Sequence, residues 1–438
     1  MKIILNIDKN IFPDRKKVGD LVELNDNLAL RWINAGIAHY PGIWEIQKSN
    51  KFKFASKKQR GEPLKLNVIC GGLMFGYSGF AEAMRNIVYS LYCKGCNVIA
   101  TPHDRVSADI MNTEKGQVIN SLHGVVYNNN YKTVTIIMTS PLGIVHRGIY
   151  GSAYRIGYAM FETQEIPKVF INSLNVNTDE LWVPSNFNLA NFTEGGYAHP
   201  IFVMPLGVDT DRFNPDKVNP LDIGTAGKFV FLSIMGWSER KGVSILAEAY
   251  LREFSSNDNT VLYLKGAWYN SDNARKDIAQ IVSKVGREDS SEIKIDFNLY
   301  PDALLPGLYK SANSFVLASL GEGWGLNYTE AMSMGLPTIG TRATSQVDFM
   351  TDENSYLIDV EEYRTEPKCN WICPQYIRGK FSIPSMTHLQ QLMRQVYSDP
   401  ELAKEKGIQA RKDMVKKYQW KHAANKWFKR LKDLEANL

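Results

Sequence analysis

The segment 314–337 constrains the fold of this chain more than any other part of the sequence. Its first residues, 314–318, form an apolar run typical of a buried strand, and 326–334 has the pattern of a helix that ends at Gly335 and Pro337. Glycines between the two favour a tight turn and allow a ligand to come close to the backbone. A strand–loop–helix junction of this kind points free backbone N–H groups and the positive end of the helix at an anion.

Two glutamates, Glu322 and Glu330, lie in the same segment. Carboxylates beside an anion site would repel a phosphate, so we expect them to accept hydrogen bonds from hydroxyl groups instead. A phosphate accompanied by neighbouring hydroxyl groups describes a nucleotide sugar. The segment therefore predicts a nucleotide-sugar site at the end of a buried strand.

The run Glu-Gly-Trp-Gly-Leu at 322–326, followed by Glu330, resembles the donor-site signature of retaining glycosyltransferases. These are the enzymes of glycosyltransferase family four, which have the GT-B fold, and the similarity extends over 304–341. The resemblance implies that Glu330 accepts hydrogen bonds from the ribose hydroxyls and that Glu322 faces the donor sugar. It implies a UDP- or GDP-sugar as co-substrate and no other cofactor. It also places five further residues at the donor: Gly323, Trp324, Gly325, Leu326 and Asn327.

A nucleoside diphosphate that leaves a sugar gains negative charge, which a metal ion or cationic side chains must stabilise. The run 236–242 lies between a predicted strand and a predicted helix, so Arg240 and Lys241 are expected to reach an anion in front of the sheet edge. Lys241 and Gly242 match the family's Lys-Gly pair, which by resemblance contacts the donor diphosphate. The family's usual arginine falls at or near 236–237 in this chain, and Arg240 is expected to take its role. A solvated basic turn is the alternative interpretation.

Two sets of residues have spacings that suggest metal ligands. Asp209 and Asp211 are spaced like the metal-binding pair of other glycosyltransferases, but 205–213 resembles the family's crossing between domains, so we expect a structural role and no metal. The odd number of cysteines, five, argues against a disulfide framework and favours reduced thiols. A zinc site is the alternative, with four candidate ligands: Cys93, Cys96, Cys369 and Cys373.

Short buried strands, among them 154–160 and 202–205, alternate with helical stretches along most of the chain, which predicts an α/β fold with two Rossmann-like domains facing a cleft. We expect the first, acceptor-side domain over 64–210 and the nucleotide-sugar domain over 211–415. A C-terminal helix within 416–438 is expected to pack back on the first domain. Residues 1–60 are expected to form a small N-terminal module, with a short strand over 18–24 and one helix over 25–35, followed by a linker. The module has no counterpart in the family plan and faintly resembles small domains of phage proteins.

Several residues of the first domain are candidates for the cleft. Ser78 is a plausible helix cap, and with Gly79 it lies in a glycine-containing turn expected to approach the donor phosphate; a turn without a ligand is the alternative. His103 and His146 are candidates for the histidine that many relatives place near the reacting carbon, or are plain surface or core residues. Glu162 resembles an acceptor-side residue of one subfamily, or caps the next helix.

Composition excludes some classes of protein. The chain of 438 residues is 44% hydrophobic and 22% charged, as in water-soluble globular proteins, and no apolar run is long enough to span a bilayer. The early Asp8 interrupts the first apolar run, so we expect a cytoplasmic protein without a signal peptide. The formal net charge of +5 fits anionic substrates or peripheral membrane contact. The most basic stretch, 404–432, is also explained as the solvated face of a helix.

The leading hypothesis is a metal-independent, retaining glycosyltransferase that moves a sugar from a nucleoside-diphosphate sugar to a hydroxyl of a glycan, lipid or other acceptor. One rival is a phage-type enzyme that glucosylates modified DNA bases, which the N-terminal module and the basic charge favour and a salt-dependent affinity for DNA would support. The other rival is a catalytically inactive sugar-nucleotide-binding protein. The intact set of Glu322, Glu330 and Lys241 speaks against that second rival.

Overall fold

The fold is that of a computed structural model of the whole chain. The residues that it describes are 2–5, 21–23, 38–39, 64–123, 127–145, 152–267, 269–298, 300–365 and 379–438. Most of the N-terminal module, with its predicted helix and linker, lies outside the described residues, as do His146, Cys369 and Cys373.

The first domain is built around a six-stranded parallel sheet with the strand order β5-β4-β6-β7-β8-β9. Its elements are β4 (Leu66–Gly72), α3 (Gly79–Cys93), β5 (Asn97–Pro102), α4 (Ala108–Met111), α5 (Glu114–Ser121), β6 (Lys132–Met138), α6 (Pro141–Val145), β7 (Tyr154–Tyr158), α7 (Lys168–Asn177), β8 (Glu180–Val183), α8 (Asn186–Gly195) and β9 (Ile201–Val203). Strand β4, which lies between β5 and β6, is buried along its whole length, because helices cover both faces of the sheet.

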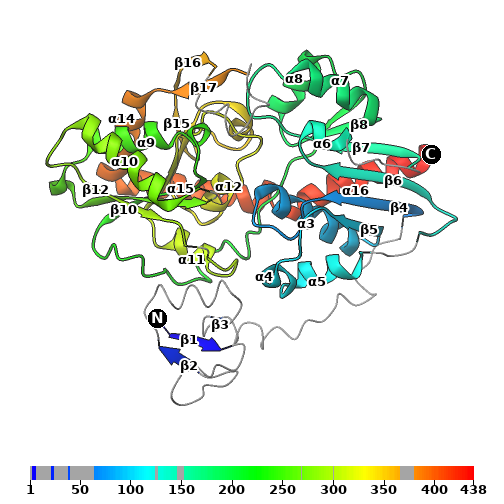
Figure 1. Cartoon of the computed structure of the whole chain (residues 1–438), viewed down its shortest axis with the longest axis horizontal. Coiled ribbons are helices and arrows are strands. Elements are labelled where there is room, and N and C mark those ends of the chain that lie inside the picture. Colours follow the sequence, from blue (N-terminus) through cyan, green and yellow to red (C-terminus); the bar gives the residue numbers. More distant parts are fainter. Residues whose placement is uncertain are drawn as a thin grey trace.

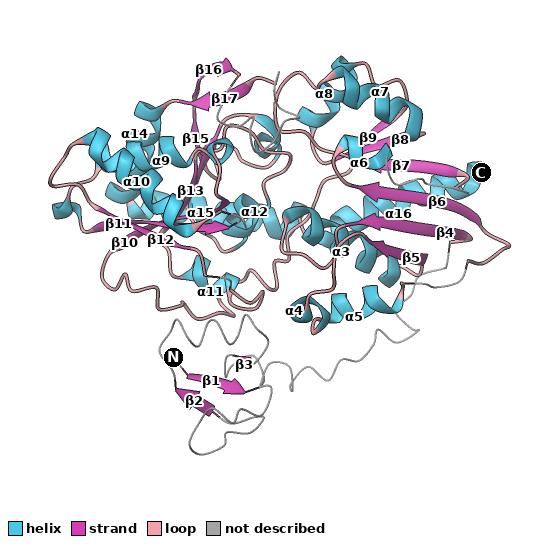
Figure 2. Ribbon diagram, viewed as in Figure 1, coloured by secondary structure: helices cyan, strands magenta, loops and turns pink. Residues whose placement is uncertain are grey.

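The second domain has another six-stranded parallel sheet, in the order β12-β11-β10-β13-β14-β15. Its helices and strands are β10 (Phe229–Gly236), η2 (Glu239–Lys241), α9 (Val243–Glu253), η3 (Ser256–Asp258), β11 (Thr260–Ala267), α10 (Ser271–Val285), β12 (Glu292–Asp296), α11 (Leu305–Lys310), β13 (Ser314–Leu317), α12 (Leu326–Ser333), β14 (Thr338–Thr341), η4 (Thr344–Asp348), β15 (Tyr356–Ile358), β16 (Val360–Arg364), β17 (Phe381–Pro384), α14 (Met386–Ser398) and α15 (Pro400–Lys417). This is the strand order of the Rossmann fold, which confirms the predicted α/β architecture. Figures 1 and 2 show the two sheets side by side, with helices on both faces.

The chain crosses between the domains twice, and the two crossings touch. The backbone N–H of Val208 donates to the carbonyl of Tyr418 at 2.8 Å, next to a bridge between Val208 and Gln419. After the second crossing, the last helix α16 (Trp420–Asn437) packs against α3 in the first domain (Figure 1). Arg430 of this helix pairs at 2.5 Å with Glu180, a carboxylate that is fully buried at the start of β8.

Two small antiparallel sheets complete the described structure. Strands β1 (Lys2–Leu5), β2 (Leu21–Glu23) and β3 (Ala38–His39) form one, and β2 falls inside the strand predicted over 18–24. The pair β16 and β17 forms the other, which the sequence did not predict. In the part of the chain that the structure describes, no helix combines the length and the apolarity needed to cross a membrane.

Most predicted elements of the two domains are present, with differences at their ends. The strand expected over 202–205 lies at Ile201–Val203 instead; Pro205 beyond it has no N–H for the sheet ladder and begins the crossing. The strand expected over 154–160 ends at Tyr158, where the chain turns toward the second domain. Ser78 caps α3 as predicted, since its hydroxyl accepts the N–H of Ala81 at 3.2 Å.

Candidate functional site

The predicted cationic loop and the predicted glutamate loop meet at one point of the second sheet. The chain winds outward from β10 to β12 and then returns to β13 on the other side of β10, so strand order reverses between β10 and β13. Ligands of open parallel sheets bind at such switch points, beyond the carboxyl ends of the strands. The loop after β10 carries Arg240 and Lys241, and the loop after β13 carries Glu322.

Close packing of these two loops depends on Gly242. A Cβ atom at this position would lie 1.8 Å from the carbonyl oxygen of Ala318, and the backbone has φ +69°. Only glycine meets both conditions without displacing the neighbouring strand. The contact brings Leu320 N within 2.8 Å of the carbonyl of Arg240, which fixes the height of the cationic turn above β13.

Lys241 and Glu322 form a buried ion pair. The ammonium group of Lys241 donates to Oε1 of Glu322 at 2.6 Å, and the hydroxyl of Ser319 donates to the same oxygen at 2.7 Å. Burial raises the pKa of Glu322, but Lys241 and Arg240 outweigh that effect and hold its pKa below the ordinary value. Among the described residues, none donates to the other oxygen, Oε2, which is therefore available to a ligand hydroxyl.

Arg240 joins the two domains at the same point. Its Nη1 donates to the carbonyl of Gly321 at 2.6 Å, and its Nη2 lies 4.0 Å from the carboxylate of Glu162, which follows β7. The domains are in backbone contact here, because a Cβ atom on Gly321 would lie 2.0 Å from the carbonyl oxygen of Glu162. The structure thus brings the acceptor-side candidate Glu162 to the predicted cationic loop.

Glu330 lies further along α12, opposite Tyr309 of α11. Tyr309 donates its hydroxyl to Glu330 at 2.8 Å. Burial raises the pKa of Glu330 to about 7, with Arg212 opposing the shift and Glu82 adding to it. The carboxylate therefore gains a proton more readily than an exposed glutamate, and a ligand that donates hydrogen bonds would favour its charged form.

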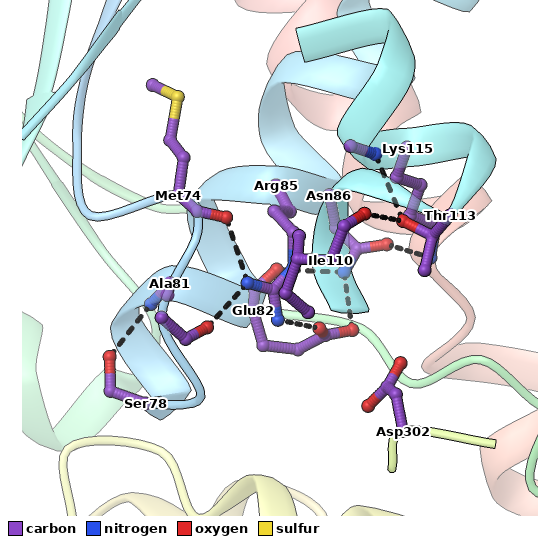
Figure 3. A network of polar contacts seen from close by, with 12 residues as sticks. Met74, Ser78, Ala81, Glu82, Arg85, Asn86, Ile110, Thr113, Lys115 and Asp302 are labelled. Atoms are coloured by element: carbon purple, nitrogen blue, oxygen red, sulfur yellow. Dashed lines mark hydrogen bonds and ion pairs between the residues drawn. The ribbon is translucent and has the colours of Figure 1, made fainter. Parts of the chain in front are cut away.

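The glycine-containing turn of the first domain is held from both sides. Asp104 accepts the backbone N–H groups of Met74, Phe75 and Gly76 at 2.8, 2.9 and 2.6 Å. From the other side, Arg85 of α3 donates to the carbonyls of Met74 and Gly76 at 2.9 and 2.7 Å (Figure 3). The N–H groups of residues 74–76 are therefore occupied by a carboxylate of the chain itself.

The N-terminus of α3 is the part of this turn that faces the second domain. A Cβ atom on Gly79 would lie in van der Waals contact with the side chain of Leu326, at 3.5 Å. Leu326 is the first residue of α12, so the N-terminal ends of two helices approach each other across the cleft. Helix N-termini carry partial positive charge and free N–H groups, which makes the space between them suitable for an anion.

The remaining predicted donor residues lie in different environments, some facing the first domain and some facing the second sheet or the crossings. Gly323 packs against Met160 of the first domain, Gly325 has φ +98° at the start of α12, and the side chain of Asn327 donates to the carbonyl of Ile234 on β10. The ring of Trp324 lies against Phe349, 4.9 Å between centroids. That ring is turned toward the crossings, so a donor contact from Trp324 would come from its backbone.

The other candidate residues have the following surroundings. His103 lies just after β5, and its backbone N–H donates to the carbonyl of Gly72 at 2.8 Å. Its ring lies beside Gly71, because a Cβ atom on that glycine would be 3.3 Å from Nε2 of His103. The carboxylate of Asp209 accepts the N–H of Arg212 at 3.0 Å, and Asp211 pairs with Lys217. Three described cysteines are not in disulfide bonds: Cys70, Cys93 and Cys96.

Two groups of residues at the domain interface were missed by sequence reasoning. The first is a charged cluster at the N-terminal half of α3, partly shown in Figure 3, with Arg212 of the crossing pairing with Asp302 at 2.5 Å. The second is a buried hydrogen-bond network in which Asn188 donates to Ser345 at 2.9 Å and to the carbonyl of Gly323 at 3.2 Å. No local pattern marks either group, since the partners named here lie 90, 135 and 157 residues apart in the chain.

The two Rossmann-like domains, in the residues described from 64 onward, together have the GT-B fold. The chain is similar to sucrose-phosphate synthase from Thermosynechococcus elongatus, at 16% identity over 85% of this chain and 100% of that chain, with a TM-score of 0.61. It is also similar to Anabaena HepE solved with UDP and glucose, at 13% identity over 84% of this chain and 99% of that chain, with a TM-score of 0.60. At these identities the likeness shows the fold.

Sequence comparison indicates which family of enzymes the second domain resembles. Residues 226–366 match the family described as Glycosyl transferases group 1, and this segment holds Arg240, Lys241, Glu322 and Glu330. A curated relative is mannosylfructose-phosphate synthase of Agrobacterium fabrum, 29% identical over 147 residues, or 32% of this chain. The match spans about a third of the length of that relative (32%).

Proposed function

We propose that this protein is a metal-independent, retaining glycosyltransferase that uses a nucleoside-diphosphate sugar, a UDP- or GDP-sugar, and transfers the sugar to an acceptor hydroxyl. The observation that carries the proposal is the meeting of Arg240, Lys241 and Glu322 at the switch point of the second sheet. The match to group 1 glycosyltransferases over the same segment supports it.

In the proposed reaction, the donor diphosphate lies between the N-termini of α3 and α12. Lys241 and Arg240 neutralise the charge that develops on the diphosphate as the bond to the sugar breaks. At about 4 Å, one cation–anion pair is worth roughly 4 kcal/mol at an effective dielectric near 20, so two cations supply much of what a divalent metal would. Formation of this contact would draw Lys241 away from Glu322 and free both carboxylate oxygens.

Glu322 and Glu330 are proposed to bind hydroxyl groups of the donor. Oε2 of Glu322 would accept from the sugar ring, and Glu330 would accept from the vicinal ribose hydroxyls as a charged carboxylate. Retention of configuration follows in this proposal from a front-face reaction. The acceptor oxygen bonds to the anomeric carbon on the side that the diphosphate leaves, and the departing phosphate takes the acceptor's proton.

The acceptor is proposed to enter from the first domain, beside Glu162 and the turn that Asp104 holds. Relatives act on a range of acceptors according to their names, and the acceptor of this chain is left as a glycan, lipid or other hydroxyl compound. The proposal requires no resident cofactor.

The experiment is a hydrolysis screen of UDP-, GDP- and ADP-sugars in the absence of acceptor, in the presence of a chelator. We expect one donor to be turned over slowly, and NMR of the released sugar at early times to show the donor's anomeric configuration. Activity that is lost in chelator and restored by Mg²⁺ or Mn²⁺ would contradict metal independence, and an inverted product would contradict retention.

A further inference from the structure

The turn after β14 contains a residue with a strained backbone. Thr344, the first residue of η4, has φ +57°, in the left-handed region, and its side chain is buried. A β-branched residue is rarely found there, because its Cβ atom comes too close to the following carbonyl oxygen. Strain of this kind persists only where the surrounding contacts enforce it, and it is concentrated at functional sites.

Contacts on both sides of Thr344 hold it in this conformation. On the side of the second sheet, the N–H of Ala343 donates to the carbonyl of Thr341, the last residue of β14, at 2.8 Å. On the other side, the hydroxyl of Ser345 lies 2.7 Å from the hydroxyl of Ser185 in the first domain, and both residues are fully buried. The turn is therefore fixed between the second sheet and the first domain.

The same turn holds the backbone of Glu322 on both sides of its Cα atom. The hydroxyl of Thr344 accepts the N–H of Glu322 at 3.0 Å and donates its own proton to Oε1 of Gln346 at 2.9 Å. The N–H of Ser345 lies 3.4 Å from the carbonyl oxygen of Glu322. Because its proton is engaged by Gln346, the Thr344 hydroxyl presents a lone pair to Glu322.

This hold on the backbone matters most when a donor is bound. In the free protein, Lys241 and Ser319 both donate to Oε1 of Glu322. In the proposed reaction Lys241 moves to the donor diphosphate, so the position of Oε2 then depends on Ser319 and on the backbone of Glu322. A reacting group displaced by about 1 Å costs about 10²-fold in rate, so a small shift of this backbone would be felt in turnover.

We propose that Thr344 is a positioning residue for Glu322. Its left-handed backbone aims the hydroxyl at the N–H of Glu322, and the hydroxyl thereby sets where the carboxylate lies. Thr344 acts through Glu322 and makes no contact with the donor in this proposal. The effect on turnover rests on the proposed function, whereas the hold on Glu322 does not.

The first test is Thr344→Val. Valine keeps the size and the branching, so the backbone is under the same strain, but it cannot accept the N–H of Glu322. We expect kcat for donor turnover to fall by about 10–100-fold. The calorimetric affinities for the probes UDP and GDP should stay within about twofold, because Lys241 and Arg240 are proposed to bind the diphosphate. A matching loss of diphosphate affinity would show general damage to the loop and overturn the proposal.

Two matched variants accompany this test. Thr344→Ser retains the hydroxyl and should keep kcat within about threefold of the unaltered protein; a loss as large as that of Thr344→Val would overturn the proposal. Thr338→Val removes another buried hydroxyl from β14, one that donates to the carbonyl of Leu336 at 2.9 Å. It should leave kcat within about twofold, and an equal loss there would show that any buried hydroxyl on this strand has the same effect.

A double-mutant cycle separates positioning from a merely structural role. If Thr344 acts through Glu322, then adding Thr344→Val to Glu322→Gln should lower turnover by less than about threefold further. A structural role would lower turnover by the same factor in both backgrounds. That result would overturn the proposal.

The last measurement needs no activity. Exchange of the Glu322 amide proton with solvent is followed by NMR on protein labelled with ¹⁵N-glutamate, with Glu322→Gln to assign the signal. We expect slow exchange in the unaltered protein and in Thr344→Ser, and exchange at least about tenfold faster in Thr344→Val. Unchanged exchange would overturn the proposal. Faster exchange in a protein that turns over no sugar nucleotide would leave the hold on Glu322 standing and reject the proposed function alone.

Discussion

The two sides of the cleft present different chemistry to a ligand. The second domain contributes charged side chains that are already paired with each other, as Lys241 is with Glu322 at 2.6 Å. The first domain contributes mainly backbone, a turn whose N–H groups are held by Asp104 and whose carbonyls are held by Arg85. The comparison suggests that charge changes in the second domain act directly on the reaction, while changes in the first domain act through the position of the turn.

The largest effect is expected at Glu322. Glu322→Gln keeps the size of the side chain and removes the charge that Lys241 and a ligand hydroxyl both use, so transfer should fall by about 10²–10³-fold. Initial rates of donor turnover measure this, with circular dichroism to confirm the fold. Turnover close to that of the unaltered protein would show that the buried pair is structural and would remove the contrast between the two domains.

The next effect is expected at Lys241. Lys241→Ala should weaken binding of both the nucleoside diphosphate and the sugar nucleotide by about 10–100-fold, because a charge-assisted contact to phosphate is lost. Calorimetry measures both affinities, and Lys276→Ala on the exposed side of α10 is the control. An unchanged affinity for the diphosphate would exclude Lys241 from the site.

Asp104 tests the first domain. Asp104→Asn leaves one acceptor oxygen and an amide that faces N–H groups, so the free energy of unfolding should fall by about 2 kcal/mol. If the turn positions the donor, KM for the donor should rise as well. Asp109→Asn, which affects only the exposed hydroxyl of Tyr77, serves as the control. Loss of stability with an unchanged KM would mean that the turn does not contact the donor.

The smallest effect is expected at Glu330 and depends on pH. Because its pKa is raised from 4.5 to about 7, the folded protein holds this proton more tightly than the unfolded chain, and stability falls as the pH rises from about 4.5 to 7. Glu330→Gln should therefore match the original protein at pH 5 and be more stable by about 1–2 kcal/mol at pH 8. Melting curves at both values measure this, with the exposed Glu361→Gln as control; an equal difference at both pH values would contradict the shift.

Sequence patterns predicted the parts of the molecule that local rules control. The strand and helix on either side of Glu322, the cap at Ser78 and the alternation of strands with helices all follow from periodicity and turn residues within short segments. The hydrophobic runs were sufficient because each strand of a parallel sheet is buried on both faces.

The parts that were not predicted depend on contacts between distant segments. Asp104 lies 28–30 residues from the N–H groups that it binds, and Arg212 lies 90 residues from Asp302. The orientation of the Trp324 ring is a second feature that the motif did not indicate. The ring lies against Phe349, 4.9 Å between centroids, so the predicted donor contact of this residue is left to its backbone.

The position of α16 has a consequence for how the molecule is made. Trp427 and Leu431, both fully buried, belong to the core around α3, although they follow the whole second domain in the chain. The first domain therefore completes its interior only after the second domain has been synthesised. A nascent chain stopped just before α16 would carry one finished domain and one with an apolar groove open to water.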